Sequence, residues 1–258
     1  MHLIWTIFIF CLGLCIGSFL NVCIWRIPRR ESIVFPPSHC PKCDYVISWY
    51  ENIPLVSWLV LRGCCCKCKA PISMRYFWVE LLTGVMFLAV WLKINSMKLS
   101  TDLFIPFLIS NLVIVMLIVL TAFIDWDHRI IPNMITYPVM LYGFGAALVT
   151  PLLWNTKFPF KAISFSCASV LVCSGALAAF AIIGKKIFKK DALGWGDVKY
   201  IAAVAAVLGP WSCFFTVLAG SIIGSIAGVV LIAMKKGKLR TGIPFGPPLA
   251  VGTFLWIL

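Results

Sequence analysis

The sequence has little charge and very few acidic residues. Of its 258 residues only 12% are charged, and nine Asp and Glu stand against 22 Lys and Arg. Soluble domains carry about 25% charged and about 45–50% apolar residues, whereas 62% of this chain is hydrophobic. The composition excludes an ordinary soluble domain. It predicts a polytopic membrane protein of the all-α class, with many Trp and Phe side chains facing lipid.

A cleavable signal peptide, internal repeats and low-complexity linkers are also missing. The first apolar run, residues 3–22, has no basic segment before it and no small-residue cleavage site after it, and both features are typical of a signal peptide. A run of about 20 apolar residues can cross a bilayer as a helix. We therefore expect this segment to be retained in the membrane.

The apolar pattern predicts about eight transmembrane helices. The expected spans are 3–25, 76–92, 103–124, 133–152, 162–184, 198–209, 211–234 and 243–258. With these spans, 18 of the 22 basic residues lie on one side of the membrane, which the positive-inside rule identifies as the cytoplasm. The net charge of +13 is then mainly a topology signal, with a secondary attraction to anionic lipids. It does not indicate a nucleic-acid partner.

One predicted span is unusually short. The segment Val198–Leu208 ends at Gly209 and Pro210, which break the apolar pattern. We expect a short, tilted or partly re-entrant helix, which a membrane tolerates only where protein or water surrounds it.

Carboxylates stand at two predicted membrane boundaries. Asp125 and Asp127 follow the apolar segment Leu103–Leu120, and Asp197 opens a later one. Charge at or inside a bilayer costs a few kcal/mol and is a functional hypothesis by default. The predicted topology puts these boundaries on the same side, and two carboxylates that share a proton can hydrolyse a peptide through an activated water. No serine–histidine or cysteine–histidine arrangement competes with this interpretation.

The predicted cytoplasmic loop 26–75 carries two CxxC pairs separated by 21 residues. Their cysteines are Cys40, Cys43, Cys65 and Cys68. Two such pairs can form a tetrahedral four-sulfur shell around Zn²⁺, and a reducing cytoplasm favours a metal site over disulfides. Free or redox-active cysteines are the alternative, and Cys64 and Cys66 leave other ligand choices open.

Several short motifs occur together between residue 13 and about residue 250. They are Gly17-Ser-Phe-Leu-Asn21-Val22, Arg26-Ile-Pro28, Cys40-Pro-Lys-Cys43, Asn52-Ile-Pro-Leu-Val-Ser-Trp58, Leu61-Arg-Gly63, Ile72-Ser73, Arg75-Tyr76, Val79-Glu-Leu-Leu-Thr-Gly84, Asp125 with Pro132 at the seventh position after it, Gly194-Trp-Gly-Asp-Val-Lys199 and Ile243-Pro-Phe-Gly-Pro247. In these motifs the chain resembles the bacterial type IV prepilin leader peptidases, bifunctional with an N-methyltransferase, which are aspartic membrane proteases of the GxGD type.

The resemblance implies an enzyme of the bacterial inner membrane that acts on prepilins or pseudopilins. It would remove their basic leader after glycine on the cytoplasmic side and methylate the new N-terminus with S-adenosylmethionine. Asp125 and Asp197 match the two catalytic aspartates of the family. Gly194 and Gly196 would let an extended substrate backbone lie beside Asp197, because a Cβ would block that approach. Pilus or type II secretion machinery is a candidate partner, and no motif reveals where the methyl donor binds.

Three other acids receive different roles. Asp127 is expected to face water or cap its helix, and Asp191 to orient the glycine loop. Glu80 has three candidate roles: pairing with Arg75, orienting a neighbouring helix, or contributing to methyl transfer.

We expect three parts in the chain. These are a first transmembrane helix (1–25), a cytoplasmic zinc-binding loop domain (26–75) and a multi-helix membrane protease core (76–258). Two other functional classes stay open. A non-catalytic scaffold of a pilus or secretion machine would tolerate loss of either aspartate, and a transporter would need polar residues deeper in the spans than Asp125 and Asp197.

Overall fold

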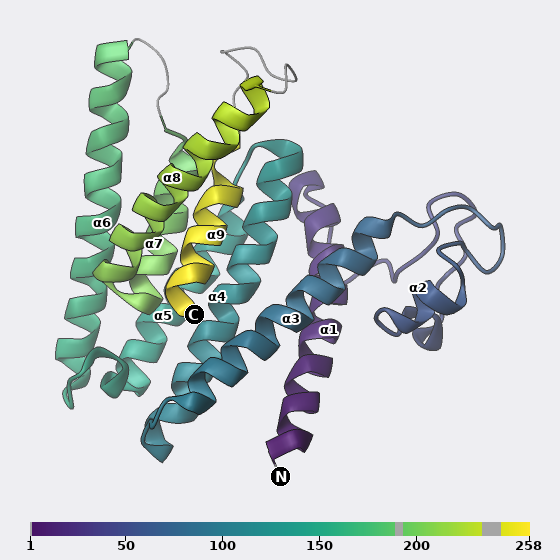
Figure 1. Ribbon diagram of the computed structural model, residues 1–258, viewed down its shortest axis with the longest axis horizontal. Coiled ribbons are helices and arrows are strands. Elements are labelled where there is room, and N and C mark those ends of the chain that lie inside the picture. Colours follow the sequence, from purple (N-terminus) through teal and green to yellow (C-terminus); the bar gives the residue numbers. More distant parts are fainter. Residues whose placement is uncertain (1, 189–192, 234–243) are drawn as a thin grey trace. The chain divides into compact units, whose positions relative to one another are not determined.

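The computed structural model of the protein describes residues 2–188, 193–233 and 244–258 (Figure 1). Within these residues the regular elements are helices, with two isolated β-bridges. The elements are α1 (His2–Arg26), η1 (Ile27–Arg29), η2 (Trp49–Asn52), α2 (Val56–Val60), α3 (Met74–Ser96), α4 (Thr101–His128), α5 (Asn133–Val149), η3 (Pro151–Trp154), α6 (Pro159–Phe188), α7 (Trp195–Leu208), α8 (Pro210–Ala233) and α9 (Gly246–Ile257). The predicted all-α class is confirmed.

Five of these helices are long and apolar enough to cross a membrane. They are α1, α3, α4, α6 and α8, and they support the predicted multi-pass membrane protein. The three other predicted spans form α5, α7 and α9, of 17, 14 and 12 residues. These are at or below the lower limit of about 17–25 residues for a spanning helix, so the count of eight spans stays a prediction.

The chain divides into two compact units, Met1–Met97 and Lys98–Leu258. In the first unit α1 and α3 pack closely through glycines. A Cβ added to Gly13 would lie 2.8 Å from the Cα of Gly84, and one added to Gly17 would lie 2.8 Å from the Cα of Glu80. Small residues allow such close approach between membrane helices. The long loop of this unit therefore connects two tightly packed helices, α1 and α3.

In the second unit the short helix α7 is surrounded by other helices. The residues Ala202–Ala206 are almost completely buried, and α5, α6 and α8 all pack against α7 (Figure 1). A Cβ added to Gly143 of α5 would lie 2.6 Å from the carbonyl oxygen of Ala206, and the Ser166 hydroxyl of α6 donates to the same oxygen at 2.9 Å. The helix is short, as expected, and its burial meets the condition that protein surrounds such a segment in a membrane.

Candidate active site and cysteine cluster

Asp125 lies in the last turn of α4 and is only 6% exposed. A carboxylate at this end of a helix meets the negative end of the helix dipole, which is unfavourable. The structure provides a compensating donor: Gly246, the first residue of α9, donates its backbone N–H to Asp125 Oδ2 at 2.8 Å. The positive end of α9 thus offsets the negative end of α4.

Gly246 is the residue with a role at the site that the sequence analysis missed. A Cβ at this position would lie 2.7 Å from Asp125 Oδ2, so a larger residue would push the carboxylate away. The next two residues, Pro247 and Pro248, have no backbone N–H, so neither could replace Gly246 as the donor to Asp125. Gly246 stands in the motif Ile243-Pro-Phe-Gly-Pro247, but nothing in that motif says that the glycine lies beside Asp125.

Asp197 lies in the first turn of α7, outside the five helices that are long enough to cross a membrane, and is 7% exposed. The backbone N–H of Gly194 donates to Asp197 Oδ2 at 3.2 Å. Burial, together with the negative charge of Asp125, raises the pKa of Asp197 to about 6. The two carboxylates are therefore close enough to influence each other, and such groups titrate as a pair.

The chain that follows α4 packs directly on the start of α7. A Cβ added to Gly196 would lie 3.1 Å from the Cβ of Ile131, and Lys199 Nζ donates to Asn133 Oδ1 at 2.8 Å. Gly194 has an ordinary φ of −76°, and a Cβ there would lie 3.2 Å from Asp197 Oδ2. Both glycines therefore allow a neighbouring group to come close to the backbone, Ile131 at Gly196 and the Asp197 carboxylate at Gly194. Gly194 needs no unusual backbone conformation.

Two other acidic residues of this region, Asp127 and Asp191, are not part of the pair. Asp127 is exposed, whereas Asp125 is buried, and the predicted role of Asp127 in facing water or capping its helix stays a prediction. Asp191, predicted to orient the glycine loop, lies outside the described residues.

The sulfur atoms of four cysteines come together in the first unit. The side chains of Cys40, Cys43, Cys65 and Cys68 lie within 4.8 Å of one another. The backbone N–H of Tyr45 donates to the Cys43 sulfur, and those of Cys68 and Lys67 donate to the Cys65 sulfur. A four-thiol set of this kind is the donor set of structural zinc sites, so the residues present fit the predicted metal.

The two CxxC turns have the same backbone hydrogen bonds. The N–H of Cys40 donates to Tyr45 O, and the N–H of Cys65 donates to Ala70 O, at 2.9 and 2.8 Å. The residue after each pair, Asp44 and Lys69, has a left-handed φ of 53° and 57°. No internal repeat is visible in the sequence, but the turns are a repeat of backbone geometry.

The neighbouring cysteines have other surroundings. The Cys66 side chain hydrogen-bonds to the carboxylate of Glu51, and Cys64 pairs with Pro71 in a β-bridge. Among the ligand choices left open by the sequence, the structure therefore favours Cys65 and Cys68.

Glu80 holds the loop of the first unit in place. It is 8% exposed, it accepts the backbone N–H of Leu55 at 2.9 Å, and the Ser18 side chain also hydrogen-bonds to it. Of its candidate roles, this geometry favours orientation of neighbouring structure, with the loop as well as α1 among its partners.

Comparisons with known proteins cover most of the chain. The model of the bacterial peptidase A24 N-terminal domain matches residues 11–94, and that of the type IV leader peptidase family matches residues 112–229. A prepilin leader peptidase/N-methyltransferase of Myxococcus xanthus is 40% identical over 242 residues, which are 92% of this chain and 67% of that protein.

Two other relatives match over most of their own length. A prepilin leader peptidase/N-methyltransferase of Stutzerimonas stutzeri is 32% identical over 96% of this chain and 88% of its own length. A type 4 prepilin-like proteins leader peptide-processing enzyme of Escherichia coli is 35% identical over 93% of this chain and 88% of its own length. No solved structure gives a significant match.

Proposed function

Because the chain belongs to the type IV leader peptidase family, we propose that it is a membrane aspartic endopeptidase with N-methyltransferase activity. It removes the basic leader of a type IV prepilin or pseudopilin after glycine and methylates the new N-terminal residue. The observation that carries the proposal is the buried pair Asp125 and Asp197, in which burial and the charge of Asp125 raise the pKa of Asp197. Relatives named for this enzyme support it over a non-catalytic scaffold.

The two aspartates act as a pair that holds one proton. The ionised carboxylate accepts a proton from the water that attacks the scissile carbonyl. The protonated one donates a hydrogen bond to the carbonyl oxygen and later a proton to the leaving amine. In each residue Oδ2 accepts a backbone N–H, from Gly246 or Gly194. We assign the two Oδ1 atoms to the water and the substrate carbonyl.

One cavity of the second unit suits an apolar substrate segment. A cavity of about 310 Å³ lies beside Gly246, and its lining residues are small or apolar: Ser221, Gly224, Ser225, Pro244, Phe245 and Pro248. We assign it to the apolar helix that follows the cleavage site of the substrate. Gly194 leaves room for the substrate backbone beside Asp197, and Gly196 lets Ile131 pack closely against the start of α7 and so fixes the position of Asp197.

The four-cysteine cluster holds a structural Zn²⁺ in this proposal. The loop domain 26–75 has little apolar core, and zinc binding supplies folding free energy in small domains of this kind, about 10–16 kcal/mol in zinc-finger peptides. The metal cross-links the two CxxC turns, which would otherwise be held together only by the surrounding loop. Residues 76–258 form the protease core in this proposal, and both aspartates lie in the second compact unit, Lys98–Leu258.

The site faces the cytoplasm of a bacterial inner membrane in this proposal. The support is the charge distribution, since 18 of 22 basic residues fall on the side that carries Asp125 and Asp197. S-adenosylmethionine supplies the methyl group. The substrates come from pilus or type II secretion machinery, which makes such an assembly the expected partner.

The proposal is tested by co-expressing the protein with a candidate prepilin and measuring the pilin by mass spectrometry. We expect the leader to be lost after glycine and the new N-terminus to gain one methyl group. An intact prepilin would contradict the peptidase activity. A cleaved but unmethylated pilin would contradict only the methyltransferase activity.

A further inference from the structure

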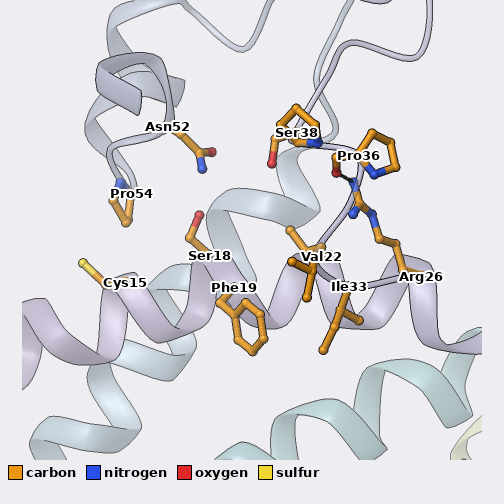
Figure 2. A pocket seen from close by; sticks show the side chains of 12 residues that line it. Cys15, Ser18, Phe19, Val22, Arg26, Ile33, Pro36, Ser38, Asn52 and Pro54 are labelled. Carbon is orange, nitrogen blue, oxygen red and sulfur yellow. Dashed lines mark hydrogen bonds between the residues drawn. The ribbon is translucent and has the colours of Figure 1, made fainter. Parts of the chain in front are cut away.

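A cavity of about 350 Å³ lies in the N-terminal unit between α1 and the loop that follows it (Figure 2). One face of α1 forms its floor, with side chains at helical spacing: Cys15, Ser18, Phe19, Val22 and Arg26. The loop segments 33–38 and 52–54 provide the walls. Small-molecule sites occupy about 300–1,000 Å³, so the cavity has the size of a binding site. Asp125 and Asp197 belong to the other unit.

Arg26 brings a buried positive charge to one end of this cavity. The residue is 8% exposed, and its guanidinium donates to the carbonyls of Ser32 and Pro36 at 2.9 and 2.7 Å. Within the described parts of the chain no carboxylate forms an ion pair with it. A guanidinium has five N–H donors, and these two bonds leave donors for a ligand. Because a buried charge without an opposite charge is costly, the cavity is suited to an anion at this end.

A negative charge lies behind the other end. Ser18 lines the cavity and points toward Asn52 across it (Figure 2). Behind Ser18, the carboxylate of Glu80 hydrogen-bonds to the Ser18 side chain and to the backbone N–H of Leu55. Ser18 and Arg26 are eight residues apart on one helix, which is about 12 Å along its axis. The cavity thus has a positive end, a negative end and the apolar side chains of Phe19 and Val22 between them.

We propose that this cavity is the binding site of S-adenosylmethionine, and that Arg26 holds its carboxylate. The inference rests on the proposed methyltransferase function and names its site. The ligand combines a carboxylate, two cationic groups and an aromatic purine. Arginine suits the carboxylate because it can form two parallel charge-assisted hydrogen bonds. The charge of Glu80 favours the cationic groups, and Phe19 and the loop prolines offer apolar contact to the purine.

The test measures ligand binding to the full-length protein by calorimetry in phosphatidylcholine nanodiscs, where no anionic lipid competes for Arg26. Arg26→Gln should weaken S-adenosylmethionine binding about 10- to 100-fold, because a hydrogen bond to a charged group is lost. Arg30→Gln is the matched control, since Arg30 is exposed and does not line the cavity, and it should bind as the unchanged protein does.

Decarboxylated S-adenosylmethionine makes the test specific for the assigned contact. This ligand lacks only the carboxylate, so Arg26→Gln should change its affinity by less than about threefold. An equal loss for both ligands, or no loss for either, would overturn the assignment of Arg26.

A second variant addresses the cavity without removing Arg26, which also holds the loop carbonyls. Val22→Trp fills the floor and should abolish binding of both ligands, while an unchanged zinc content shows that the loop of this unit has folded. Unchanged binding in Val22→Trp would overturn the site even if the methyltransferase is real. If the unchanged protein cleaves prepilin but binds no S-adenosylmethionine, the inference fails and the peptidase proposal stands.

Discussion

The cysteine cluster and the aspartate pair are sites built in opposite ways. Each CxxC pair lies within one tight turn, and Cys40 and Cys68 are 28 positions apart in the chain. Asp125 takes its N–H donor from Gly246, 121 positions away, and Asp197 comes from a third helix. A metal site can therefore form from local turns and one loop. The carboxylate pair exists only when α4, α7 and α9 are packed together.

The largest expected effect comes from neutralising either aspartate. Asp125→Asn or Asp197→Asn keeps the side-chain shape but removes the proton transfer, so leader cleavage should fall by about 10³-fold or more. Membrane insertion and zinc content should not change, because the cysteine turns do not depend on this pair. Cleavage is measured as the fraction of prepilin processed over time.

Asp127→Asn is the matched control for both variants. Asp127 is exposed two residues from Asp125, and its variant should cleave within about twofold of the unchanged protein. Robust processing by Asp125→Asn or Asp197→Asn would remove the basis for a carboxylate mechanism.

The zinc content of cysteine variants tests the cysteine cluster. The double change Cys40→Ser and Cys65→Ser removes one ligand from each turn, and we expect the bound zinc to fall from one ion per chain to none. Cys66→Ser should keep its zinc, because Cys66 bonds to Glu51 outside the cluster. Elemental analysis of the purified proteins distinguishes these outcomes. Stoichiometric zinc in the double variant would argue against the four-cysteine site.

Gly246→Ala probes the long-range packing of the aspartate site. The new Cβ would meet Asp125 Oδ2 at 2.7 Å, and a displacement of about 1 Å in a catalytic group can cost about 10²-fold in rate. We expect cleavage to fall about 10- to 100-fold with unchanged zinc content. Gly145→Ala is the control, since a Cβ there meets nothing within 4 Å. Equal rates for the two variants would mean that the Gly246 contact does not position Asp125.

The smallest effect is expected from pH. Burial and the charge of Asp125 raise the pKa of Asp197 to about 6, so the pair holds its shared proton below this pH and loses it above. Because that proton polarises the carbonyl and reaches the leaving amine, cleavage should fall about fivefold between pH 6 and pH 7. An initial-rate profile at saturating substrate measures this. A rate that rises across the interval would assign the proton to another group.

The two regions also differ in how far the sequence could describe them. The spacing of Cys40, Cys43, Cys65 and Cys68 predicted a common site, and the structure brings these sulfurs together. The spacing favoured Cys65 over Cys66 as a ligand, and the structure adds the physical reason, because the Cys66 side chain bonds to Glu51 instead. Likewise, Asp125 and Asp127 were separated only by a motif, and burial distinguishes them in the structure.

What the sequence by itself determined is the class of the protein and the identity of its chemical groups. Apolar runs longer than a bilayer is thick and paired cysteines at turn spacing both follow from local physics. Tertiary structure alone decided the contact of Gly246 with Asp125, the burial of the short helix α7, and the cavity that Arg26 shares with the loop. These depend on helices from distant parts of the chain, and no local preference specifies which of their faces meet.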